Sequence, residues 1–92
     1  MVYAYVNIII DAPDSFAAYR EKAGEALSRH GGKVVSASPK QTVLEGEMNA
    51  GLGALLGFES AEGAKAWIND PDLAEVHALR NGAGQSTVVL IG

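Results

Sequence analysis

Side chains in residues 2–10 (VYAYVNIII) alternate between two unlike faces, which predicts a β-strand. Every second position from Val2 to Ile10 is apolar, so these positions form one hydrophobic face. The opposite face mixes polar and apolar side chains: Tyr3, Tyr5, Asn7 and Ile9. We expect the first face to lie under helices and the second to meet a different environment.

Further elements follow from the same kind of local pattern. They are a helix over 14–30 ending at Gly31-Gly32, a strand over 33–38 that resumes over 41–46 after Pro39, a turn over 47–50, a strand over 51–58, a helix over 60–69 that restarts at Pro71 and ends near Gly82, and a closing strand over 85–91. Residues 51–58 (GLGALLGF) predict a strand because three glycines would each cost a helix about 1 kcal/mol.

The order strand-helix-strand-strand-helix-strand predicts one α+β domain over residues 1–92. Both helices are crossovers that connect parallel strands, and such crossovers are almost always right-handed. The expected result is a four-stranded antiparallel sheet with the helices on one face and the first and third strands in its centre. The helix-covered face is then expected to be plain core.

The uncovered sheet face is too apolar to remain in water and too polar for a simple core. We expect a second copy to cover it sheet to sheet, which gives a homodimer with room for a cavity between the sheets. Glycines at 51, 53 and 57 remove side chains beside Tyr5 and Asn7, so we expect space there.

Composition narrows the classes of partner. The net charge is −4 and the seven Lys and Arg residues are scattered, so we expect no nucleic-acid partner. No apolar run approaches the roughly 20 residues of a membrane helix, and the N-terminal residues do not resemble a signal peptide. The chain has no cysteine. We therefore expect a cytoplasmic protein that gains burial by self-association.

Several short motifs occur together in a characteristic order: AYV, DAPDSFAAYR, RHGGKVV, VLEGE, FES, AKAWINDPDL and the terminal VVLIG. In these the chain resembles the bacterial family DUF1330 of the dimeric α/β-barrel superfamily. It departs from the family pattern after the LEG motif, where Met48 and Ala50 replace the usual Trp and Pro, and where Leu52 replaces the usual Arg. The resemblance implies a ferredoxin-like β-α-β-β-α-β fold and a dimer, and it implies no activity.

Three side chains are candidates for acid–base chemistry: His30, His77 and Glu45. His30 closes the first helix and is either a general base or a residue that interacts with the helix dipole. His77 lies three residues before Arg80, so the two share a helix face, which either binds a carboxylate or is a solvated or dimer-rim face. Glu45 either reaches the open sheet face or is a solvated edge charge.

The candidate ligand-binding residues are Tyr5, Asn7, Trp67 and Arg80. Tyr5 and Asn7 either hydrogen-bond a small ligand or meet a partner subunit, and Trp67 is either a core or a pocket-wall aromatic residue. The histidine spacing fits no metal site, the glycines fit no dinucleotide fingerprint, and we expect no cofactor.

Two functions fit these residues. The first is a dimer that binds or transforms a small apolar, oxygenated molecule in a cleft on the open sheet face. The alternative is a non-catalytic dimerisation or interaction module without a ligand. An enclosed pocket of a few hundred cubic ångström units beside Tyr5 would favour the first, and a sheet face filled by partner side chains would exclude it.

Overall fold

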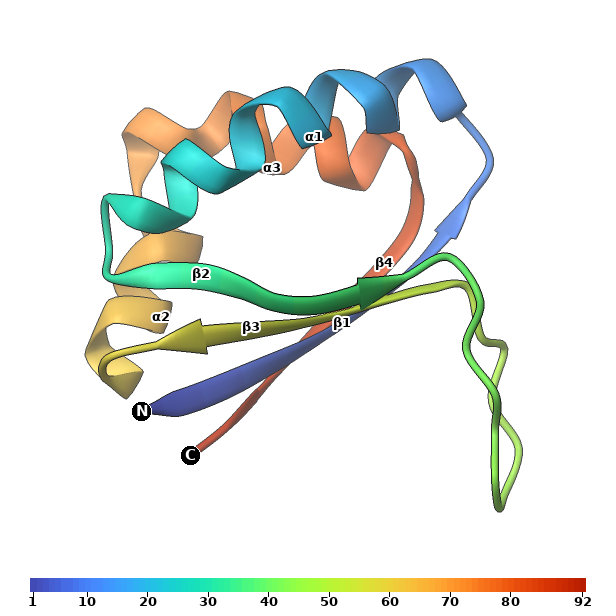
Figure 1. Ribbon diagram of the computed structural model, residues 1–92. Coiled ribbons are helices and arrows are strands. Elements are labelled where there is room, and N and C mark those ends of the chain that lie inside the picture. The colour runs from blue at the N-terminus through green and yellow to red at the C-terminus, as the bar shows by residue number, and fades with distance from the viewer.

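The computed structural model describes residues 1–92. Its elements are β1 (Val2–Ile10), α1 (Pro13–Ser28), β2 (Gly32–Ser38), β3 (Leu52–Phe58), α2 (Ala61–Asn69), the 3-10 helix η1 (Pro71–Leu73), α3 (Ala74–Gly82) and β4 (Gly84–Ile91). The strands form an antiparallel sheet in the order β2-β3-β1-β4. Helices α1 and α3 lie side by side over one face, and α2 lies near one end of the sheet (Figure 1). The predicted α+β ferredoxin-like architecture is confirmed.

The core lies between the sheet and the helices. On β1, Ala4, Val6 and Ile8 are buried and stand opposite Leu56, Ala54 and Leu52 of β3. The largest fully buried side chains are Phe58, Ile8, Leu27 and Leu73. The predicted apolar faces of both central strands therefore meet the helices, and the mixed face of β1 is turned away from them.

The predicted helix break at Asp70 is confirmed. The hydroxyl of Ser60 caps α2 by accepting from the Gly63 amide at 3.2 Å. The Asp70 carboxylate then accepts from the Asp72 amide at 2.8 Å, and Pro71 opens the next turn as η1 rather than α-helix. These two caps fix the corner between α2 and α3.

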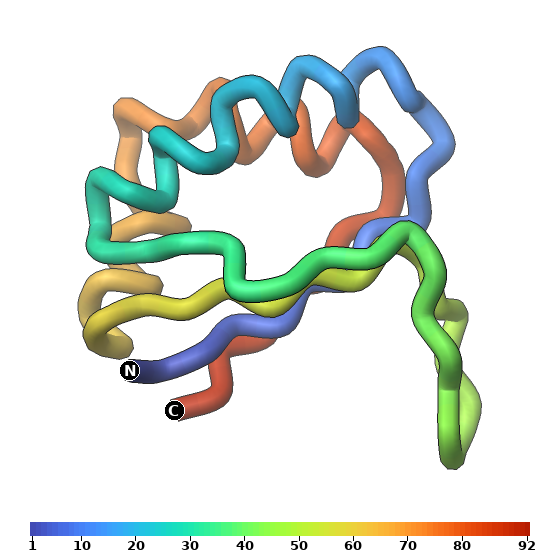
Figure 2. Tube along the Cα trace, in the orientation of Figure 1, coloured from blue at the N-terminus to red at the C-terminus, as the bar shows by residue number.

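The connection from β2 to β3 differs from the prediction. Residues 41–46 do not resume a strand, and the bend lies at residues 45–46 rather than within 47–50. Strand pairing stops at Ser38 opposite Gly53. The loop 39–51 then extends beyond the sheet on the side away from α1 and α3 (Figures 1 and 2). Its backbone leaves the sheet because the Gln41 side chain binds the open face, as described below.

Strand β2 is an exposed edge strand. Its pairing with β3 shifts between Val34 and Ser36, which leaves Val35 as a bulge. Residues 33–38 are exposed throughout. Helix α1 therefore covers β2 far less tightly than it covers the central strands. None of the helices combines the length and the hydropathy that crossing a membrane requires.

Candidate functional site

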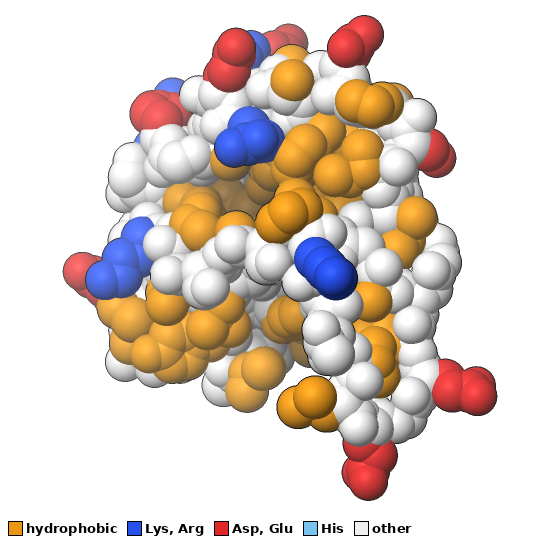
Figure 3. All heavy atoms as spheres, turned by 45° about the vertical axis from the view of Figure 1, so that its right-hand side comes forward, with side chains coloured by type: hydrophobic (Ala, Val, Ile, Leu, Met, Phe, Trp, Pro, Cys, Tyr) orange, Lys and Arg blue, Asp and Glu red, His pale blue; other side chains and the backbone are white.

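A cavity of about 590 Å³ lies between α1 and the sheet. Its walls are mostly hydrophobic and include Val6, Ile8, Phe16, Tyr19, Leu27 and Leu56. Figure 3 shows a hollow with hydrophobic walls below the helical layer. This face therefore carries the expected hydrophobic core and, in addition, a cavity that was not expected. The reason is that α1 presents the small residues Ala23 and Gly24 toward β2, which leaves the space between them unfilled.

The mouth of this cavity runs between α1 and β2. Among the lining residues, Arg20 and Gly24 of α1 are exposed, and so are Ser38 and Pro39 at the end of β2. The Arg20 guanidinium lies 5.9 Å from the centre of the Phe16 ring and forms no ion pair. Arg20 is the only charged residue among those that line the cavity. A neutral, apolar interior thus opens beside one unpaired cation.

The open sheet face carries a smaller, shallow groove of about 310 Å³ beside Tyr5, bordered by Ser36, Lys40, Gln41 and Leu55. The expected room at Gly53 is filled, since an added Cβ would lie 2.5 Å from the Gln41 side chain. The space at Gly57 is similarly bounded by Met1 and Val35, each 3.0 Å from such a Cβ. The space beside these glycines is therefore occupied by side chains of the same chain.

Asn7 and Tyr5 hold the loop 39–51 against this face. Gln41 donates to the Asn7 Oδ1 at 2.7 Å and to the Gly51 carbonyl at 3.0 Å. The Gly51 amide donates to the same Asn7 oxygen at 3.0 Å, and Asn7 donates to the Asn49 carbonyl at 3.2 Å. The Tyr5 hydroxyl donates to Gln41. The polar atoms of Asn7 are thus all bonded within the chain, an arrangement that neither sequence interpretation foresaw.

His77 and Arg80 share a helix face, as predicted, but that face is buried rather than solvated. Arg80 is 3% exposed, and its guanidinium lies 5.7 Å from the Tyr19 ring centre and 5.4 Å from that of Trp67. It donates to His77 Nδ1 at 2.9 Å, so His77 Nε2 donates to the Trp67 carbonyl at 2.8 Å. Burial, together with the Arg80 charge, lowers the pKa of His77 below its ordinary 6.5. Arg80 Nε is buried without a partner.

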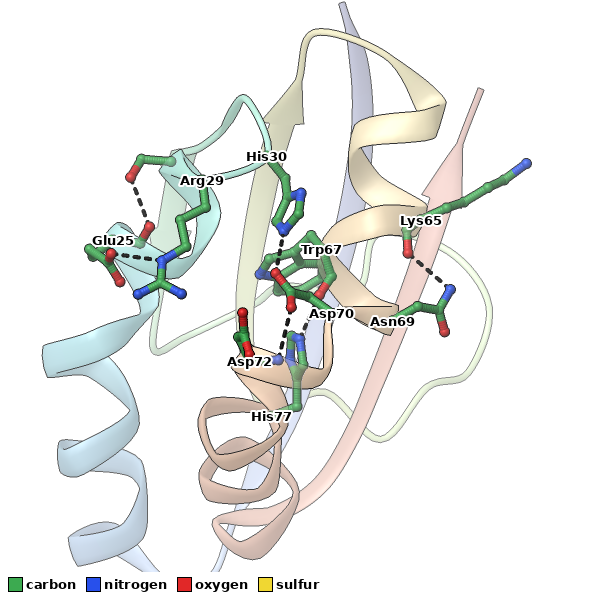
Figure 4. Close-up of polar contacts among 10 residues, drawn as sticks. Glu25, Arg29, His30, Lys65, Trp67, Asn69, Asp70, Asp72 and His77 are labelled. Carbon is green, nitrogen blue, oxygen red and sulfur yellow. Dashed lines mark hydrogen bonds and ion pairs between the residues drawn. The ribbon is translucent and has the colours of Figure 1, made fainter.

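His30 pairs with Asp70 at the corner between α2 and α3 (Figure 4). Its Nε2 lies 2.8 Å from the Asp70 Oδ2. The hydrogen bond from His30, together with that from the Asp72 amide, lowers the pKa of Asp70. Because Asp70 also caps η1, this contact joins the end of α1 to the helix break.

The predicted site residues fall in four separate places. Tyr5 and Asn7 lie on the open face, and His30 lies at the helix corner. Trp67, His77 and Arg80 contact one another in the core. Glu45 is exposed in the bend of the loop 39–51. No three His, Asp or Glu side chains lie close enough together to hold a metal ion.

A family model described as "Domain of unknown function (DUF1330)" matches residues 1–92. The chain belongs to this family. No curated protein matches the sequence of this DUF1330 protein significantly.

Solved structures share its fold at low sequence identity. A protein of unknown function from Rhodopseudomonas palustris is 21% identical with a TM-score of 0.74, the match covering 98% of this chain and 79% of that one. A dimeric ferredoxin-like protein of unknown function from Jannaschia is 12% identical with a TM-score of 0.67, covering 99% and 97%. SnoaB, a cofactor-independent oxygenase from Streptomyces nogalater, is 12% identical with a TM-score of 0.65, covering 99% and 89%.

Sequence reasoning missed Arg20, Gly24 and Gln41 in this DUF1330 protein. A signal for two of them was present, since Gly24 lies inside a predicted helix where glycine is unfavourable, one turn after Arg20. Gln41 carried no signal, because only the folded loop brings it to Asn7 and Tyr5.

Proposed function

We propose that this DUF1330 protein binds a small apolar, oxygen-bearing molecule in the cavity beneath α1. The observation that supports this best is the cavity of about 590 Å³ with mostly hydrophobic walls. Small-molecule sites are typically concave, mostly apolar and about 300–1,000 Å³ in volume. Empty apolar space in a core costs stability, so a small domain gains nothing from it unless a ligand occupies it.

The open sheet face supports a ligand less well. Gln41 occupies the space beside Gly53, and the groove next to Tyr5 is smaller and broadly open to solvent. The cavity beneath α1 is lined by Tyr19 and Arg20 but by no histidine or carboxylate, so binding is proposed rather than acid–base catalysis. SnoaB, a cofactor-independent oxygenase, supports the idea that this fold accepts small molecules, and at 12% identity it supports no shared reaction.

We also propose that the open sheet face forms a homodimer. Exposed apolar side chains gather there from three strands and the N-terminus: Met1, Tyr3, Val35, Val89 and Ile91. Water contact with such a surface is unfavourable, and a second sheet would remove it. The dimeric ferredoxin-like protein from Jannaschia supports this proposal. A dimer without any ligand remains the rival function.

Amide chemical shifts of the ¹⁵N-labelled protein, titrated with 2-naphthol, test the proposal. We expect shifts at cavity residues such as Ala23, Leu27 and Leu56, with little change at Ser36 and Gly53 of the open face. Gly24→Phe should block the mouth and suppress them. Ala17→Phe, at an exposed position on the same helix outside the cavity, is the matched control. Shifts confined to the open face would move the site there, and no shifts would favour the dimerisation module.

A further inference from the structure

We infer that the molecule bound beneath α1 is an apolar carboxylic acid whose carboxylate pairs with Arg20 at the mouth. This inference rests on the proposed function of the cavity and adds the chemical class of its ligand. It comes from the arrangement of charge and space where α1 faces β2.

Arg20 is available to an anion. It forms no ion pair, and Glu25 on the same helix is paired with Arg29 at 2.8 Å. No carboxylate lines the cavity to compete for the guanidinium. The Phe16 ring, 5.9 Å from the guanidinium, supports its position by a cation–π contact. A planar guanidinium suits a carboxylate because two parallel hydrogen bonds can form.

The position of Arg20 at the mouth of the cavity matters as much as its charge. Arg20 is exposed, so a carboxylate bound there keeps part of its hydration and escapes the full desolvation cost of a buried ion. The interior beyond it is apolar and suits a hydrocarbon or aromatic body. The cavity therefore matches a molecule that is charged at one end and apolar along the rest.

Gly24 lines the cavity near its mouth, beside Arg20 and the apolar interior. It lies one turn after Arg20, and a Cβ added there would meet no atom within 4 Å. Its φ is not positive, so the backbone does not require glycine. Glycine inside a helix costs about 1 kcal/mol relative to alanine, and neither strain nor a packed neighbour explains it here. An unobstructed mouth beside the cation does explain it.

The test compares 2-naphthoate with 2-naphthamide, which have similar shape but differ in charge. Affinities are measured by titration calorimetry for the wild type, Arg20→Gln and Lys22→Gln. Lys22→Gln makes the same change of charge at an exposed α1 position outside the cavity. We expect the wild type and Lys22→Gln to prefer the acid about tenfold, and Arg20→Gln to bind both ligands about equally.

Two outcomes would contradict the inference in different ways. Equal wild-type affinities, or a preference that survives in Arg20→Gln, would overturn the acid and leave the cavity as a site for neutral molecules. Absence of binding by either ligand to any variant would overturn the proposed function itself. Circular dichroism confirms that each variant is folded, and the wild-type affinity for 2-naphthoate should also weaken with added salt.

Discussion

Gln41 donates a hydrogen bond of 2.7 Å to the side chain of Asn7, which joins the base of the loop 39–51 to the centre of the open sheet face. Asn7 is 9% exposed, so its amide needs internal partners, and Gln41, Asn49 and Gly51 supply them. One side chain on β1 thus contacts both ends of the loop.

Replacing Asn7 with leucine should therefore loosen the loop rather than empty a pocket. Asn7→Leu leaves the Gly51 amide and the Gln41 side chain without their partner, and we expect a loss of about 1–3 kcal/mol in the free energy of unfolding. Gln41→Ala should lose about 1 kcal/mol. Urea unfolding measures both, and in Asn7→Leu hydrogen exchange should accelerate at the Gly51 amide, which donates to Asn7 in the wild type. The control is Gln85→Ala, at an exposed open-face residue, and an equal effect there would contradict the role of Gln41.

Acidification should destabilise the protein through His77. Its folded-state pKa lies below the ordinary 6.5 because burial and Arg80 disfavour the charged ring. As pH falls through 6.5, the unfolded chain binds a proton before the folded chain does, so stability is lost below that pH and is fully present above it. Urea unfolding at about pH 7.5 and about pH 5 measures the loss. His77→Gln should reduce this pH dependence, and an unchanged dependence would show that another group causes it.

Gly24 and Gly63 should respond oppositely to alanine. Gly24→Ala adds a methyl group to open space in α1 and should stabilise the protein by about 0.5–1 kcal/mol. Gly63→Ala adds a Cβ only 2.6 Å from the His30 carbonyl and should destabilise it despite the better helix propensity of alanine. Thermal or urea unfolding of the two variants provides the comparison. Similar gains in both would mean that the α2 contact relaxes without cost.

Self-association should depend on the open face. We expect light scattering at micromolar concentration to give about twice the 9.6 kDa chain mass for the wild type. Val89→Glu places a charge among exposed apolar side chains of that face and should give the monomer mass. Ile68→Glu is the control, because Ile68 is a similarly exposed apolar residue on α2. A monomeric wild type, or dissociation by Ile68→Glu alone, would exclude the open face as the interface.

The fold could be predicted from the sequence because the local patterns and the order of the elements along the chain both indicate the same β-α-β-β-α-β architecture. Alternation in β1, the cap at Ser60 and the break at Asp70-Pro71 each depend on neighbours in sequence, and each is present in the structure. The strand over 41–46 failed because a contact distant in sequence, Gln41 with Asn7, decides the path of that backbone.

The candidate site was less predictable for the same reason. Periodicity shows which side chains face the core, but it does not show whether the core fills its volume. Small residues at Ala23 and Gly24 and the loosely covered β2 together create the cavity, and no single segment contains that information. The burial of Arg80 likewise depends on Tyr19 and Trp67, which come from two other helices.

Strand β2 forms part of the cavity wall but adds little to the packed core. It borders the cavity through Val34, Ala37 and Ser38, yet it joins the sheet along one edge only and contributes no buried side chain. Bending this strand outward breaks no core contact among β1, β3 and the helices. On the proposed function, substitutions in β2 should therefore change how quickly a ligand enters the cavity, while substitutions at Phe58 and Leu73 should mainly change the free energy of unfolding.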